Sequence, residues 1–133
     1  MANWYGLSRT NTFKVKDEAA FRAWADTLPE VELFEEEEDR FGFYTTGDGM
    51  WPSCRYQEEC DDWSEMDFAE ELAVHLAEGE AAVLITVGHE KARYGTGYAL
   101  AIRSDGKTLA VNIDDIYTKV RRKWGVATTR AEY

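Results

Sequence analysis

The central part of this chain is strongly acidic and at the same time rich in aromatic residues. Between Glu30 and Glu80 it carries 18 acidic residues and two basic ones, a net charge of −16 in a protein whose total is −11. A concentrated negative surface attracts cationic surfaces, but its self-repulsion also costs stability that a hydrophobic core must offset. The large aromatic residues among the acids are Phe34, Phe41, Phe43, Tyr44, Trp51, Tyr56, Trp63 and Phe68.

The length and composition favour a single folded domain covering residues 1–133. Apolar residues make up 44% of the chain and aromatic residues 14%, which is enough for a core despite the high charge. No apolar run approaches the ~18 residues of a membrane span, and the first residues lack the apolar stretch of a signal peptide. We therefore expect a cytoplasmic protein that contacts no membrane. In that compartment Cys54 and Cys60 are expected to stay reduced, although a disulfide between them is sterically possible.

Hydrophobic periodicity predicts a strand, a helix and a hairpin in the first third of the chain. Residues 12–16 alternate as a strand does, and a helix follows, with Asp17 as its N-cap and Pro29 as its stop. The segments 30–36 and 41–46 flank a tight turn. Their alternation of apolar and polar residues is typical of a hairpin with one solvated face.

A long loop is predicted in the middle of the chain. Gly47 and Pro52 indicate that residues 47–63 form a loop, which is long for a compact domain and therefore a candidate functional segment. Ser64 is then expected to cap a second helix, which Gly79 ends.

A buried strand and a hairpin are predicted after the second helix. Residues 81–87 are almost wholly apolar, which is typical of a strand in the centre of a sheet. The segments 94–103 and 107–112 flank the dipeptide Asp105-Gly106, the strongest turn signal in the chain.

A last helix, capped by Asp114 or Asp115 and ended by Gly125, completes the pattern. The order β-α-β-β-α-β-β-β-α predicts an α+β fold, with a mostly antiparallel sheet and its helices on one face. The residues expected on the inner face of the last helix are Ile116, Tyr117, Val120 and Trp124.

No constellation of residues predicts a metal site, a cofactor or catalysis. His75 and His89 could join the two cysteines as zinc ligands, but structural zinc ligands usually come in pairs two to four residues apart. A cysteine–histidine nucleophile pair is disfavoured as well, because acidic surroundings suppress the reactive thiolate. We therefore expect no cofactor, no metal and no enzymatic activity.

The acidic residues allow two interpretations. A charged run usually forms only a solvated surface. If the predicted hairpin, loop and helix share one side of the fold, however, their carboxylates would imitate duplex phosphates, which carry about one charge per 1.7 Å of axis. A basic nucleic-acid-binding site on another protein would accept such a surface, whereas nucleic acid itself would be repelled. The candidate contact residues are Glu35, Glu36, Glu37, Glu38, Asp39, Trp51, Tyr56, Glu58, Glu59, Asp61, Asp62, Trp63 and Glu65.

In small size, high acidity and mixed α and β pattern, the chain resembles the DNA-mimic proteins of phages and plasmids, such as anti-CRISPR and antirestriction inhibitors. Its opening, MANWYGLSRTNTFKVKDEAAFRAW, is similar to that of small proteins of bacterial mobile elements. The resemblance implies an inhibitor that occupies a basic protein, such as a nucleic-acid-handling defence complex, without a cofactor. Two other functions stay open: a toxin-neutralising immunity protein, and a small enzyme or ligand-binding domain that uses the 47–63 loop.

Overall fold

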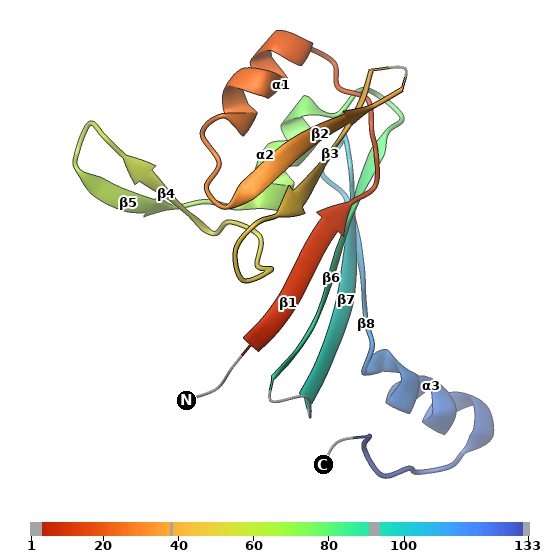
Figure 1. Ribbon diagram of the computed structural model, residues 1–133. Helices are drawn as coiled ribbons and strands as arrows, with labels where there is room; N and C mark the ends of the chain where they lie inside the picture. The colour runs from red at the N-terminus through yellow and green to blue at the C-terminus, as the bar shows by residue number, and fades with distance from the viewer. Residues whose placement is uncertain (1–3, 38, 91–93, 132–133) are drawn as a thin grey trace.

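The protein has an α+β fold built around one large antiparallel sheet (Figure 1). Its computed structural model describes residues 4–37, 39–90 and 94–131, which form eight strands and three helices. The predicted class is confirmed, and two strands are added to the predicted order. The elements are β1 (Trp4–Thr10), α1 (Glu18–Ala25), β2 (Val31–Glu36), β3 (Arg40–Thr45), β4 (Cys54–Gln57), β5 (Asp62–Glu65), α2 (Phe68–His75), β6 (Ala81–Glu90), β7 (Tyr94–Arg103), β8 (Thr108–Asn112) and α3 (Asp115–Trp124).

Six strands form the main sheet in the order β2-β3-β1-β6-β7-β8, and all of their pairings are antiparallel. The central strand is β6, which pairs with β7 along its whole length and with β1 from Leu84 to Glu90. Its apolar sequence predicts this position, and the structure confirms it. The hairpin of β7 and β8 around Asp105-Gly106 is confirmed as well.

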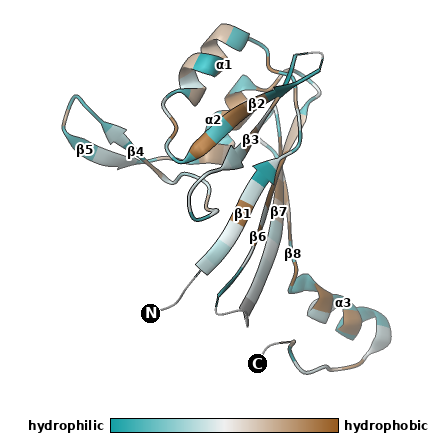
Figure 2. Ribbon diagram, viewed as in Figure 1, coloured by the Kyte–Doolittle hydropathy of each residue, from teal (hydrophilic) through white to brown (hydrophobic). Residues whose placement is uncertain are grey.

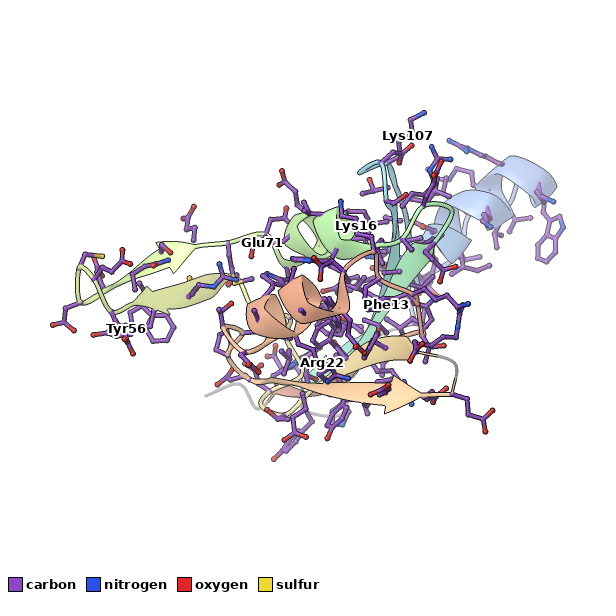
Figure 3. The ribbon with its side chains drawn as sticks, turned by 90° about the horizontal axis from the view of Figure 1, so that it is seen from above. Phe13, Lys16, Arg22, Tyr56, Glu71 and Lys107 are labelled. Atoms are coloured by element: carbon purple, nitrogen blue, oxygen red, sulfur yellow. The ribbon has the colours of Figure 1, made fainter. Side chains whose placement is uncertain are left out.

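The hydrophobic core lies between one face of the sheet and the helices α1 and α2 (Figures 1 and 3). Asp17 caps α1 as predicted, because its carboxylate accepts a hydrogen bond from the Ala20 backbone N–H at 3.1 Å. His75, at the end of α2, stacks on Trp24 of α1 with 4.9 Å between ring centroids. Burial, aided by the charge of Lys16, lowers the pKa of His75. The fully packed core residues are Phe13, Phe21, Phe41, Phe43, Phe68, Ala69, Leu72, Ala73, Leu76, Ala82, Leu84 and Ile102.

The first strand is not where periodicity predicts it. Residues 12–16 form only two isolated bridges, Phe13↔Phe41 and Val15↔Leu76, and the strand β1 precedes them. The alternation over 12–16 arises because Phe13 is fully buried as the chain crosses the core. Over β1 the pattern is weak, since the buried positions of that strand are Ser8 and Thr10 rather than apolar residues.

The predicted loop 47–63 is also wrong over its second half. Residues 54–57 and 62–65 form β4 and β5, a separate two-stranded hairpin. Ser64 lies in β5 and does not cap α2. That role belongs to Asp67, whose carboxylate accepts a hydrogen bond from the Glu70 backbone N–H at 3.0 Å. The two short strands lack a regular alternation of apolar residues, so periodicity could not identify them.

The last helix has no inner face in this structure. None of its side chains is buried, and Trp124 is 73% exposed. The helix α3 extends beyond the end of β8 and away from the core, with alternating polar and apolar bands along its length (Figures 1 and 2). Its predicted end at Gly125 is confirmed. Among the described residues, no helix has both the length and the apolar character needed to cross a membrane.

Candidate binding site

The hairpin of β4 and β5, which we call the acidic arm (residues 54–65), projects from the body of the protein (Figures 1 and 3). Its strands pair only with each other, from Cys54↔Glu65 to Gln57↔Asp62. An isolated two-stranded hairpin has marginal stability in water. The arm therefore depends on the contacts that its base makes with the rest of the fold.

Two aromatic side chains lie opposite each other on the arm. Tyr56 of β4 pairs with Trp63 of β5, and their rings meet edge to face with 5.7 Å between centroids. They are 44% and 59% exposed, although both are large and apolar enough to form the centre of a contact with another protein. The Tyr56 hydroxyl donates to the Asp61 carboxylate, and this hydrogen bond raises the pKa of Tyr56.

The surface of the arm is acidic. Its five carboxylates are exposed, and its single basic residue, Arg55, is directed toward the body of the protein. The turn between the strands places Asp61 at a φ of 51°, a left-handed conformation that Asp tolerates better than most residues. The acidic residues of the arm are Glu58, Glu59, Asp61, Asp62 and Glu65.

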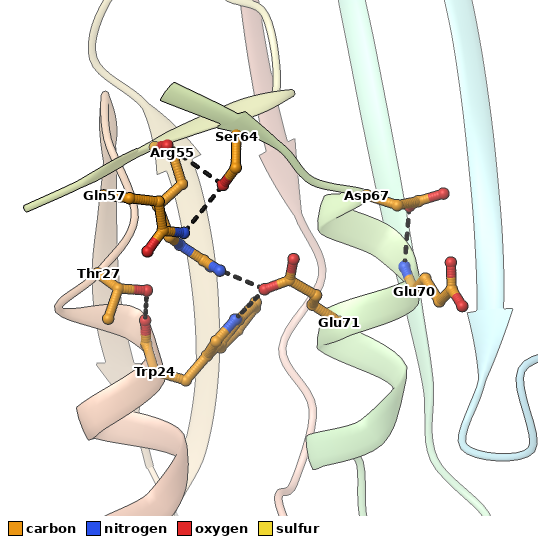
Figure 4. A network of polar contacts seen from close by, with 8 residues as sticks. All are labelled: Trp24, Thr27, Arg55, Gln57, Ser64, Asp67, Glu70 and Glu71. Atoms are coloured by element: carbon orange, nitrogen blue, oxygen red, sulfur yellow. Dashed lines mark hydrogen bonds and ion pairs between the residues drawn. The ribbon is translucent and has the colours of Figure 1, made fainter. Parts of the chain in front are cut away.

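A polar network holds the base of the arm (Figure 4). One carboxylate oxygen of Glu71, on α2, accepts hydrogen bonds from Trp24 Nε1 at 2.8 Å and from Arg55 Nη2 at 2.7 Å. These bonds join the arm to both core helices. Sequence reasoning missed this anchor, although Arg55 is one of only two basic residues in the acidic stretch, a signal that it neutralises a particular carboxylate.

We expect Glu71→Ala to release the arm from the body. The substitution leaves the partly buried Arg55 and the Trp24 indole N–H without their acceptor, which typically costs about 1–3 kcal/mol. Amide hydrogen exchange should become faster throughout residues 54–65, and the free energy of unfolding should fall. The control is Glu70→Ala, which removes a neighbouring, exposed carboxylate of the same helix. Equal protection of the arm in the two variants would contradict the anchoring role.

A second acidic group lies around the turn between β2 and β3. Glu35, Glu36, Glu37 and Asp39 are exposed there, and the remaining predicted contact residue, Glu38, lies outside the described residues. This turn and the tip of the acidic arm lie on opposite sides of α1 in both views (Figures 1 and 3). The structure thus divides the predicted contact residues into two groups and does not bring them together on one face.

Basic side chains accompany the β2–β3 group. Arg22 lies 2.8 Å from a Glu35 carboxylate oxygen and 3.4 Å from one of Glu18. Carboxylate oxygens of Glu18, Glu35 and Asp39 approach within 4.8 Å of one another, the only such group in the described part of the chain. The Arg22 guanidinium pairs with two of these carboxylates, and its single positive charge offsets one of their three negative charges.

Trp51 has a packing role. Its indole stacks on Phe68 with 5.0 Å between centroids and an interplanar angle of 7°, and it packs against the core. Trp51 nevertheless stays partly exposed and lines a groove together with Trp63. Between the arm and the segment that follows α1 lie two grooves, of about 440 and 430 Å³, which both include Pro29 and Trp63.

The cysteines and histidines do not form a common site in the described part of the chain. Cys54 and Cys60 are free, exposed thiols at the base and the turn of the acidic arm. His75 packs instead among the aromatic rings of the core. Comparison of the sequence and the fold with other proteins adds no assignment, since no family model, curated protein or solved structure matches the chain.

Proposed function

We propose that this protein is an inhibitor that binds, through its acidic arm, the basic nucleic-acid-binding site of another protein. One observation carries the proposal: a projecting hairpin combines five exposed carboxylates with an exposed Tyr56–Trp63 pair. A site that binds nucleic acid presents Lys and Arg side chains to phosphates. Carboxylates on a narrow projecting element offer such a site the same charge as a strand of phosphates.

The two kinds of side chain on the arm have different roles in this proposal. The carboxylates accelerate encounter with a cationic surface, because charges at the rim of an interface mainly affect the association rate. Tyr56 and Trp63 supply apolar contact area, whose loss mainly raises the dissociation rate. A defence protein that acts on nucleic acid, in a bacterial host, fits this chemistry as a partner.

The acidic arm is a better contact element than the β2–β3 turn. Arg22 pairs with Glu35 and offsets one negative charge there. Arg40 lies in the same surface depression as Glu36 and Glu37, although its ion pair, at 3.3 Å, is with Glu80. On the arm, by contrast, the single cation Arg55 is directed to Glu71 and the outer surface stays acidic.

Neutralising the arm should weaken binding far more than neutralising the other acidic group. The double variant Glu58→Gln/Glu59→Gln is expected to slow association, and affinity should fall steeply as salt rises from about 50 to 200 mM. The matched control, Glu36→Gln/Glu37→Gln, removes the same number of charges and should bind like the unmodified protein. Surface plasmon resonance with the captured partner measures both rates. Equal effects in the two variants would contradict a role for the arm.

The partner can be identified with the same variants. The candidates are proteins in a bacterial lysate that bind the unmodified protein and the control but do not bind the arm variant. Each is then tested with duplex DNA, which should compete with this protein for one site. Simultaneous binding of DNA and this protein would exclude the proposed mimicry. A captured toxin nuclease would instead indicate an immunity protein.

A further inference from the structure

The half of the sheet farthest from α1 and α2 has an uncovered apolar face. On β1, β6 and β8 most side chains that point away from the core helices are apolar, with Leu109 reaching 79% exposure, although Arg9 and His89 lie on the same face. Monomeric proteins rarely expose contiguous apolar patches larger than a few hundred Å². We call this surface the open face; its residues are Tyr5, Leu7, Ile85, Val87, Leu109, Val111 and Ile113.

The strand register makes the open face continuous. Leu7 pairs with Val87, and Ala99 of β7 pairs with both Ile85 and Val111. Along β7 the residues on this face are small: Gly95, Gly97, Ala99 and Ala101. Small residues between two strands of branched side chains leave a shallow groove. A depression of about 490 Å³ lies at the end of this groove that includes His89 and Gly95.

The helix α3 carries an apolar stripe that none of the described residues buries. Ile116, Val120 and Trp124 are spaced four residues apart and therefore lie on one side of the helix. The helix does not pack on its own sheet, since none of its side chains is buried, and two residues, Ile113 and Asp114, connect it to β8. That connection is fixed by two hydrogen bonds: the Asn112 N–H donates to the Asp115 carboxylate, and the Asp114 N–H donates to the Asn112 side-chain oxygen, each at 2.9 Å.

We propose that the protein forms a two-fold symmetric dimer, in which α3 of each copy lies in the groove of the open face of the other. This inference is independent of the proposed inhibitor function. The dimensions agree: β6 and β8, which flank the groove, are two inter-strand spacings apart, about 9–10 Å, and a helix with its side chains is about 10–12 Å across. A helix of ten residues is about 15 Å long, shorter than the ten-residue strand β7 that it would follow. Two-fold symmetry forms the same helix-in-groove contact twice, so that each copy buries both its groove and its α3 stripe.

The charges of the two surfaces also favour a second copy. The helix α3 carries four basic residues and one acidic residue, in a chain whose net charge is −11. The register places Glu32 in one row across the sheet with Tyr44, Arg9 and Ile85. Glu32 and Glu36, both exposed, therefore lie on the same side of the sheet as the open face, with β3 and the Arg9 side chain between them and β6.

Sedimentation velocity on the full chain tests for the dimer. From about 1 to 100 µM the unmodified protein is expected to sediment as a dimer. Val111→Glu on the open face and Trp124→Glu on α3 should each weaken association about tenfold or more, with unchanged thermal unfolding of the monomer because both positions are exposed. Val74→Glu is the matched control, on an equally exposed position of α2. A monomer throughout the range, or binding of α3 to phosphatidylserine vesicles in place of a dimer, would overturn the proposal.

A spin label tests the arrangement directly. The label is attached at Thr118→Cys, on the polar side of α3, after Cys54→Ser and Cys60→Ser have removed the native thiols. Labelled protein is mixed with ¹⁵N-enriched protein that carries no label, so that only contacts between copies broaden signals. Broadening of the amides of β6, β7 and β8 is the expected result. Broadening confined to α3 or to the acidic arm would show a different contact and contradict the proposed packing.

Discussion

Replacing Phe21 by Ala is expected to lower the free energy of unfolding by about 3–5 kcal/mol, a large part of the ~5–15 kcal/mol available to a domain. Phe21 is fully buried at the centre of the aromatic core. Its ring meets those of Phe41 at 5.3 Å, Phe43 at 5.7 Å and Phe13 at 6.0 Å between centroids. Two segments, β3 and the bridge segment around Phe13, therefore lose contact with α1 at once, and rigid rings close the resulting cavity only in part.

The control for this change is Phe34→Ala. Phe34 lies on β2 outside the core cluster, where its ring is partly exposed beneath the Arg9 guanidinium. The same atoms are removed, but from a site that solvent can fill, so a clearly smaller loss is expected. Urea unfolding of both variants measures the difference. Equal losses would show that Phe21 is not at the centre of the core.

Replacing Gly49 by Ala is the second change with a large expected effect. Gly49 has a φ of 91°, and a Cβ placed there would lie 2.3 Å from the carbonyl carbon and 2.5 Å from the carbonyl oxygen of Gly6 in β1. The left-handed backbone costs a residue with a Cβ about 1–2 kcal/mol, and overpacking against the backbone adds about 1–3 kcal/mol. The segment after β3 must therefore move away from β1, where the Ser8 hydroxyl donates to the Gly49 carbonyl.

Gly79→Ala separates the two costs. Gly79 has a similar φ of 84°, but no atom lies within 4 Å of the position that its Cβ would take. This variant therefore reports only the backbone strain, and the difference between the two variants reports the clash. In urea unfolding, the free energy of unfolding of Gly49→Ala should be clearly lower than that of Gly79→Ala. Equal midpoints would mean that the segment around Gly49 is not packed against β1.

Short-range signals in the sequence predicted much of this fold. The cap at Asp17, the stop of α3 at Gly125 and the hairpin around Asp105-Gly106 each depend on a few adjacent residues. The apolar run in β6 predicted the centre of the sheet correctly, although only one face of the strand is covered, since Ile85 and Val87 are exposed. For these elements, local conformational preference and the tertiary structure agree.

The acidic composition also predicted a charged surface, but not its distribution. Acids that are neighbours in the sequence, in the β2–β3 turn and in the acidic arm, lie on opposite sides of α1. Their pairing with cations depends on contacts between different elements. Arg22 of α1 pairs with Glu35 of β2, whereas Arg55 of the arm pairs with Glu71 of α2 and not with the acids of the arm. Periodicity within one segment contains no information on such pairs.

By itself, then, the sequence determined the α+β class, the start of α1, both ends of α3, the central strand and the excess of negative charge, whereas α1 ends before Pro29 and α2 ends at His75, before the predicted Gly79. Only the tertiary structure decided that β1 lies between β3 and β6, with residues more than thirty and seventy positions away. It also decided that residues 54–65 form a projecting arm and that α3 leaves its apolar side uncovered. The physical reason is the same in each case: strand pairing and burial are relations between distant segments, and an amphipathic pattern specifies a face to be covered without specifying what covers it.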